Sequence, residues 1–216
     1  MSTNQIEFEK FPKIPRAHKV NYVVTEKIDG TNAQLVIISE PKEQIRESKN
    51  KTVEIIVDGT VYLLFAGSRN RWITPEDDNF NFSQYVYDNA EELVKLGPGR
   101  HFGEWYGSGI QRGYGLDHKR WALFNAGRWT ECMKATRDGL TNAFPMCNVD
   151  VVPILGYVPM DFSGKDKIME DLKENGSVLQ PGFMEPEGII LHNHKYFLTF
   201  KDTYEFSEGK WKENKE

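Results

Sequence analysis

The feature that most constrains the fold of this chain is a pair of Asp-Gly turns, each lying between two runs rich in β-branched and apolar residues. Asp29-Gly30 and Asp58-Gly59 both have this setting. An Asp-Gly pair between two such runs is the strongest short-range indication of a two-residue β-hairpin. We therefore predict two antiparallel hairpins early in the chain, formed by residues 20–25 with 33–38 and by residues 52–57 with 60–67.

The rest of the chain combines further strand patterns with two helical ones. Apolar residues follow helical spacing from Phe82 to Val94 and over residues 165–175, and a glycine follows each run. The polar run 40–51 predicts a solvent loop, and the glycine-rich run 107–115 predicts a flexible one. We expect an α+β fold in which antiparallel sheets form a groove flanked by a few helices. Further strands are predicted over residues 100–107, 120–125 and 149–157, with a last hairpin over residues 186–201.

Composition is that of an ordinary globular protein. The chain of 216 residues is long enough for one large domain, and no run approaches the ~20 apolar residues of a membrane span. The N-terminus has no basic region followed by an apolar core, and the spacing of Cys132 and Cys147 fits neither a metal site nor a disulfide framework. We therefore expect a cytoplasmic protein with no membrane segment.

Charge leaves the kind of partner open. The net charge of −5 does not favour nucleic acid. Between Arg100 and Arg137, however, seven Lys and Arg residues stand against three acidic ones. A protein that follows a nucleic-acid backbone needs only a local basic face. The alternative is a solvated surface of mixed charge.

Lys27 is the candidate nucleophile in this pattern. It follows the first predicted strand and precedes Asp29-Gly30, where its amine can point into a groove. A lysine held among apolar walls and other cations loses proton affinity, and the neutral amine is a nucleophile. Taken alone, Lys-x-Asp-Gly is also compatible with a hairpin that carries a surface lysine.

Further short motifs follow this one in a fixed order. The order resembles that of the covalent nucleotidyltransferase superfamily, which includes DNA ligases, RNA ligases and mRNA capping enzymes. Glu26, Asn32 and the run Phe-Gly-Glu-Trp at 102–105 are most similar to ATP-dependent RNA ligases of the phage RNA-repair type. The ordered series is Lys27-x-Asp29-Gly30, Arg69, Phe102-Gly103-Glu104, Phe124, Glu187-Gly188-Ile189-Ile190 and Lys201.

The resemblance implies a fold and a reaction. The fold is a single ligase adenylation domain over residues 1–216, of the nucleotidyltransferase (ATP-grasp-like) type and without an OB-fold domain. The reaction uses ATP with Mg²⁺ or Mn²⁺ to form lysyl-AMP, transfers AMP to a 5′-phosphate, and joins that end to a 3′-hydroxyl. The partner is RNA with such ends, including a nicked duplex.

The resemblance also implies roles for individual residues. Lys27 is the nucleophile, and Lys201 offsets charge on the α-phosphate. Glu187 is the metal-binding carboxylate. Glu26 contacts the base edge, Glu104 contacts the ribose and Phe124 stacks on adenine. Asn32 and Arg69 contact phosphates or strand ends. Two simpler alternatives are that Phe124 is a core residue and that Glu104 is a salt-bridge partner.

Two departures from the family pattern keep other functions open. The superfamily usually ends in Lys-x-Lys, but the first of these positions is Thr199 here, and Lys195 is the nearest other lysine. The alternatives are a DNA ligase or capping-type enzyme, and a degenerate domain that binds RNA ends without joining them. The pair His192 and His194 is compatible with metal binding, but a polar turn explains it better.

Overall fold

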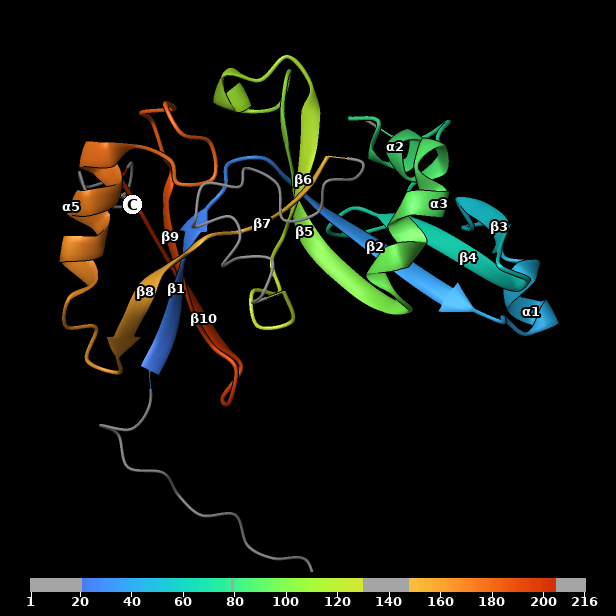
Figure 1. The fold of residues 1–216 in the computed structure, drawn as a ribbon, viewed down its shortest axis with the longest axis horizontal. Coiled ribbons are helices and arrows are strands. Elements are labelled where there is room, and N and C mark those ends of the chain that lie inside the picture. Colours follow the sequence, from blue (N-terminus) through green and yellow to red (C-terminus); the bar gives the residue numbers. More distant parts are fainter. Residues whose placement is uncertain (1–20, 79, 130–147, 205–216) are drawn as a thin grey trace, which may run out of the picture.

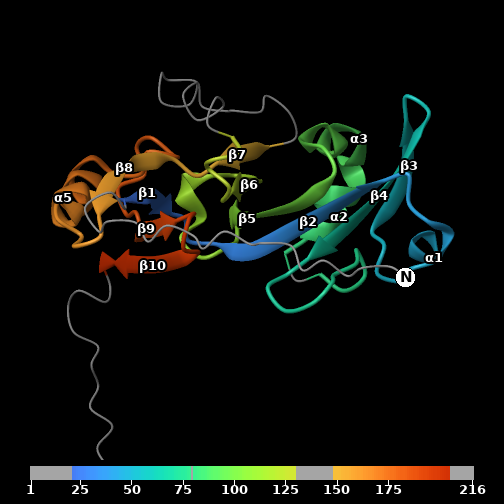
Figure 2. The same ribbon diagram turned by 90° about the horizontal axis from the view of Figure 1, so that it is seen from below.

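The chain forms two β-sheets that follow one another along the long axis of the molecule (Figures 1 and 2). The computed structural model describes residues 21–78, 80–129 and 148–204. The lead-in before residue 20, the stretch 133–145 and both cysteines lie outside these ranges. No helix in the described part is long and apolar enough to cross a membrane.

One sheet has four strands in the order β10-β9-β1-β8, and the other has six in the order β3-β4-β2-β5-β6-β7. Neighbouring strands are antiparallel as expected, except that β6 and β7 are parallel. The strands are β1 Asn21–Lys27, β2 Thr31–Ser39, β3 Val53–Val57, β4 Thr60–Gly67, β5 Gly99–Gly107, β6 Lys119–Leu123, β7 Val149–Val151, β8 Ile154–Pro159, β9 Gly188–Asn193 and β10 Leu198–Thr203. The helices are α1 Glu43–Arg46, α2 Phe82–Asp88, α3 Ala90–Leu93 and α5 Lys165–Asn175, with single 3₁₀ turns at Val94–Leu96 and Gly113–Gly115.

The predicted hairpin at Asp29-Gly30 is wrong. Strand β1 pairs with β8 and β9, whereas β2 pairs with β4 and β5, so the chain crosses from one sheet to the other between them. Gly30 is not among the residues with positive φ, as a hairpin turn would require. A Cβ atom there would overlap the carbonyl oxygen of Trp105. The glycine is therefore needed because β5 passes so close.

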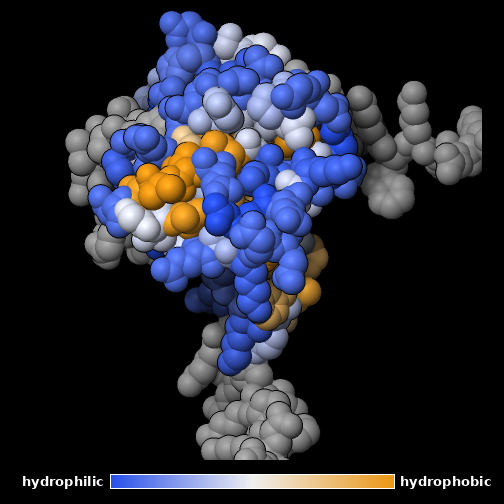
Figure 3. Space-filling view, turned by 90° about the vertical axis from the view of Figure 1, so that its right-hand side faces the viewer, coloured by the Kyte–Doolittle hydropathy of each residue, from blue (hydrophilic) through white to orange (hydrophobic). Residues whose placement is uncertain are grey.

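The second Asp-Gly hairpin is confirmed. Val57 faces Thr60 across the turn, and Asp58 and Gly59 have φ values of 49° and 78°. Positive φ at both central residues is the type I′ geometry that an Asp-Gly pair favours. Strand β3 lies at the edge of its sheet, and its Ile56 is 68% exposed. The end of the molecule that carries β3 shows hydrophobic surface within a polar surround (Figure 3).

The helices cover one face of each sheet. Phe82 of α2 packs edge-on against Trp105 and Trp121 in the core of the six-stranded sheet. Met169 and Leu172 of α5 pack against the four-stranded sheet in a second core. Alternate strand residues point to opposite faces. The other face of each sheet is therefore available to line a site between them.

Three predicted elements differ in detail from the structure. The helix expected from Phe82 is interrupted at Asn89, whose side-chain amide donates to the Tyr85 carbonyl oxygen at 2.8 Å and competes with the helical pattern. The polar run 40–51 is not all loop, because it contains α1. The strand expected over 149–157 is broken at Pro153 into β7 and β8, which belong to different sheets. The helix α5 and the hairpin of β9 and β10 are confirmed.

Replacing Gly30 with alanine is expected to cost about 3 kcal/mol of unfolding free energy, because the new methyl group overlaps the backbone of β5. Gly59→Ala is the matched control, because that site has open space and only the backbone cost of about 1 kcal/mol. Urea unfolding of both variants measures the difference. Equal losses would show that the crossover can relax around a side chain.

Candidate active site

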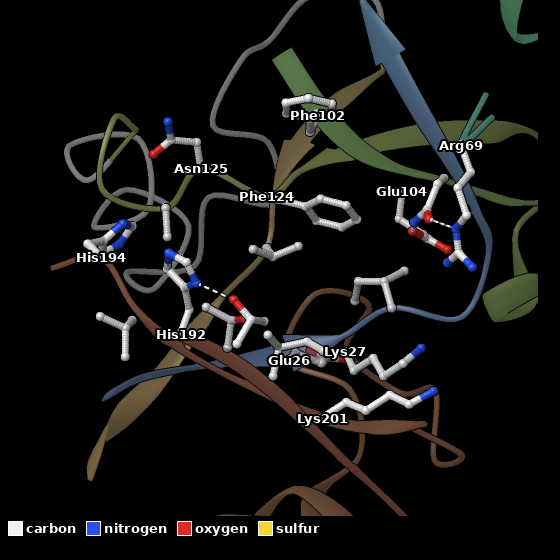
Figure 4. Close-up of a pocket in the computed structure, with 18 of the residues that line it drawn as sticks. Glu26, Lys27, Arg69, Phe102, Glu104, Phe124, Asn125, His192, His194 and Lys201 are labelled. Carbon is white, nitrogen blue, oxygen red and sulfur yellow. Dashed lines mark hydrogen bonds between the residues drawn. The ribbon is translucent and has the colours of Figure 1, made fainter. Parts of the chain in front are cut away.

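A pocket of about 540 Å³ lies between the two sheets. Strands β1, β9 and β10 form one wall, and β2, β5 and the residues after β6 form the other (Figure 4). Seven of the eight residues singled out from the sequence line it, and Glu187 contacts one of them. Those seven are Glu26, Lys27, Asn32, Arg69, Glu104, Phe124 and Lys201.

Lys27 and Glu187 form an ion pair at one end of the pocket. Lys27 is the last residue of β1, and it faces Gly188 across the ladder to β9. Its Nζ donates to Oε2 of Glu187, and the two side chains are only 21% and 18% exposed. Burial raises the pKa of Glu187, and the hydrogen bond from Lys27 opposes that rise. The amine therefore lies beside a carboxylate that binds a proton more readily than usual.

Asn32, Glu104 and Arg69 form a second polar group on the opposite wall. Asn32 and Glu104 face each other across β2 and β5, which points both side chains to the same face. Asn32 donates to Oε2 of Glu104 at 2.7 Å, and Arg69 donates to Oδ1 of Asn32 at 2.7 Å. Burial raises the pKa of Glu104 to about 7. The group offers hydrogen-bond donors and acceptors beside Lys27.

Glu26 is buried beneath the pocket, with 1% of its surface exposed. Its Oε2 accepts backbone N–H groups of Val178 and Leu179 at 2.9 and 3.0 Å. Its Oε1 has no hydrogen-bond partner among the described residues. Burial raises its pKa. One oxygen is thus fixed by a segment that the sequence did not single out, and the other is buried without a partner among the described residues.

Phe124 follows β6 and is 41% exposed, so it is not a core residue. Its backbone N–H donates to the carbonyl oxygen of Phe102 at 2.9 Å, and Figure 4 shows its ring projecting into the pocket. Ile190 of β9 and Val152 add apolar lining. The pocket therefore combines an exposed aromatic face with aliphatic surface.

Lys201 and Thr199 lie at different ends of the pocket. Figure 4 shows the amine of Lys201 beside that of Lys27. Thr199 faces His192 across the β9–β10 ladder, and its hydroxyl lies 2.6 Å from Nδ1 of that ring. The predicted polar turn at His192 and His194 is wrong for His192, which lies within β9, and both rings line the pocket. No group of three metal-ligating side chains is found in the described ranges.

The loop after β5, expected to be flexible, is fastened to the crossover between the sheets. Arg112 donates to Oδ2 of Asp29 at 2.9 Å, and the backbone N–H of Asp29 donates to the Tyr114 hydroxyl at 2.9 Å. Tyr114 is 3% exposed. Arg112 therefore forms an ion pair with Asp29 of the Lys-x-Asp-Gly motif, and Arg120 forms one with the buried Asp150. Part of the positive excess predicted for this window is neutralised internally.

The RNA ligase family model matches residues 20–209. This chain belongs to the RNA ligase family. A comparison with curated proteins returns no match. The match spans every motif that the sequence analysis placed in order, from Lys27 to Lys201.

Solved structures of an RNA ligase from Naegleria gruberi are similar to this RNA ligase family member in fold. A mutant bound to ATP and Mn has a TM-score of 0.52 at 16% identity, and an apo mutant has 0.51 at 16%. A further mutant, bound to AMP and Mn, has 0.50 at 15%. Each match covers 87% of this chain and 50% of the other. The chain therefore spans about half the length of these relatives.

Glu104→Gln is expected to flatten part of the pH dependence of stability between pH 4.5 and 7. Because the folded-state pKa of Glu104 is raised from 4.5 to about 7, its contribution is complete below pH 4.5 and is lost as pH rises through 7. The wild type should lose up to a few kcal/mol across this window, and the variant less.

Urea unfolding at a series of pH values measures this. Glu54→Gln is the control. The hydrogen bond from Arg46 lowers the pKa of Glu54 below 4.5, so the stability due to that carboxylate is lost as pH falls below this window. If the Glu104→Gln variant loses stability with pH as steeply as the wild type, the assignment to Glu104 is contradicted.

Proposed function

We propose that this chain is an ATP-dependent RNA ligase that acts through a covalent lysyl-AMP on Lys27. The observation that carries the proposal is that seven of the eight residues drawn from the ordered motifs line one pocket and the eighth, Glu187, pairs with Lys27. Family membership and the fold shared with an RNA ligase solved with ATP and Mn support the same reaction class.

In the first step Nζ of Lys27 attacks the α-phosphorus of ATP. A nitrogen–phosphorus bond forms, the bond to the bridging oxygen breaks, and pyrophosphate leaves. The amine must give up a proton, and Glu187 is its hydrogen-bonded neighbour, with a pKa raised by burial. Negative charge accumulates on the α-phosphoryl oxygens, and Lys201 offsets it from the sheet that also carries Lys27.

The remaining pocket residues are proposed to hold the nucleoside. Phe124 stacks on the adenine, opposite the aliphatic surface of Ile190. The unpartnered Oε1 of Glu26 accepts a hydrogen bond from the base edge. Glu104 accepts a hydrogen bond from a ribose hydroxyl, and Asn32 and Arg69 serve phosphates or strand ends. Each of these side chains belongs to a residue that lines the pocket.

A divalent metal fits Glu187 and the phosphates of ATP. Mg²⁺ and Mn²⁺ accept carboxylate oxygen, and Mg²⁺ commonly binds through one or two carboxylates together with substrate phosphates and water. A single protein carboxylate therefore suffices, in keeping with the absence of a three-ligand group from the described ranges. When bound, the metal neutralises phosphate charge.

The later steps use the same groups. The RNA 5′-phosphate attacks the adenylate, the nitrogen–phosphorus bond breaks, and Lys27 recovers its proton. The 3′-hydroxyl then attacks the activated 5′-phosphate and releases AMP.

A DNA ligase or a capping-type enzyme would share the first step and differ in the nucleotide or strand it accepts. A domain that only binds RNA ends remains the alternative, motivated by Thr199 in place of a lysine.

Incubation with ATP and Mg²⁺ is expected to add the mass of one adenylate to the intact protein. Lys27→Ala should abolish the addition, because the variant lacks the proposed nucleophile. Parallel incubations with GTP and NAD⁺ distinguish the capping-type and dinucleotide-dependent reactions by intact mass spectrometry. No adduct with any of these nucleotides would refute the proposed chemistry.

Lys201→Gln is expected to slow adenylate formation about 100-fold, because a preorganised cation beside the α-phosphate is lost. Lys195→Gln is the matched control, because Lys195 lies in the exposed turn between β9 and β10. Single-turnover kinetics with labelled ATP measures both. Equal rates for the two variants would remove Lys201 from the proposed mechanism.

Joining of a nicked RNA duplex by the purified protein is expected, with Lys27→Ala inactive. Binding of RNA without joining, despite adenylation of Lys27, would favour the end-binding alternative. A nicked DNA duplex of the same sequence is the comparison for strand preference. Faster joining of DNA than of RNA would favour a DNA ligase.

A further inference from the structure

The face of the six-stranded sheet that lines the pocket includes Arg100 and Phe102 as well as Glu104. In β5, Arg100, Phe102 and Glu104 alternate with core residues and so share this face. Phe102 faces Gln34 of β2, just as Glu104 faces Asn32. Because two residues of a strand span about 7 Å, Phe102 lies one short step outward from the polar group at Glu104. Arg100 and Phe102 therefore form the solvent-exposed part of this pocket wall.

Aromatic rings and a guanidinium are grouped at this rim. Phe102 is 51% exposed, although it lies within a central strand of the sheet. The guanidinium carbon of Arg100 lies 5.9 Å from the centre of the Phe102 ring and 5.6 Å from that of Trp72. Figure 4 shows Phe102 on the same side of the pocket as Phe124. We call Trp72, Arg100 and Phe102 the Phe102 platform.

The platform carries a charge that no carboxylate of the described residues neutralises. Arg100 donates to the side-chain oxygen of Gln34, a neutral group. Neither Arg100 nor Arg69 forms an ion pair with a carboxylate of the described residues, in contrast to Arg112 and Arg120. Positive charge beside an exposed ring is the combination that binds unpaired nucleotides, with the cation on phosphate and the ring on a base.

We propose that the Phe102 platform binds the unpaired end of the RNA strand beside the reacting phosphate, by stacking one base on Phe102 and holding a phosphate with Arg100. The inference rests on the proposed function and names the surface by which the substrate is held. Inside a duplex both faces of a base are stacked on its neighbours, so the platform favours an unpaired strand end over the interior of a duplex.

Three variants test the platform. Phe102→Leu keeps apolar volume and removes the ring, Phe102→Trp keeps a stacking face, and Arg100→Gln removes the charge. Phe197→Leu and Lys167→Gln are matched controls; Phe197 is 85% exposed in the β9–β10 turn, and Lys167 is exposed on α5. Fluorescence anisotropy of a short 5′-phosphorylated, 3′-labelled single-stranded RNA over a salt series measures binding. Intact mass after ATP and Mg²⁺ measures adenylation without RNA.

Phe102→Leu should weaken RNA binding about tenfold, the effect of losing one stacked base, and Phe102→Trp should restore it. Arg100→Gln should reduce the slope of log affinity against log salt by about 0.7, the value for one phosphate contact on a single strand. RNA binding is measured without ATP, so these changes do not depend on adenylate formation, and both controls should bind RNA like the wild type.

Wild-type RNA binding by Phe102→Leu and Arg100→Gln, with Lys27 still adenylated, would overturn the platform and leave the proposed function intact. Failure of the wild type to form the adenylate would refute the proposed function instead. Loss of binding in Phe102→Trp as well would show that the position supports structure and not stacking.

Discussion

The close passage of the chain from one sheet to the other at Gly30 is the constraint on which the rest of this structure depends. Three residues connect β1 to β2, and there is no room for a side chain against β5. A second crossover runs beside the first, since the backbone N–H of Glu26 donates to the carbonyl oxygen of Pro153 at 3.1 Å. Lys27 therefore lies at the junction, where the open faces of both sheets meet.

Local chemistry decided which elements the sequence could predict. Asp58-Gly59 forms its hairpin because both residues take positive φ and the flanking strands have no other neighbour so close in sequence. Asp29-Gly30 has the same two residues, but its flanking strands pair with β8 and β9 on one side and with β4 and β5 on the other. Choice of sheet depends on contacts between distant residues, and no short pattern encodes it. The strand predicted over 149–157 ignored Pro153, a residue that cannot donate a hydrogen bond within a ladder.

The site was more predictable than the fold around it, because the motif order carried information that spacing did not. All eight residues drawn from that order meet at one pocket or its ion pair. The groups that hold them were missed. Backbone N–H groups of Val178 and Leu179 fix Glu26, and any residue type other than proline supplies such a donor. Arg112 was assigned to a flexible loop, and only the fold shows that it reaches Asp29.

The division of the pocket between two sheets has a mechanical consequence. The amines of Lys27 and Lys201 come from one sheet, while Phe124 and Glu104 come from the other. A ligand that contacts both walls acts as a brace between them, so its binding energy depends on the angle at which the sheets meet. Substitutions at the crossovers can thus alter affinity for a nucleotide without touching any atom that contacts it.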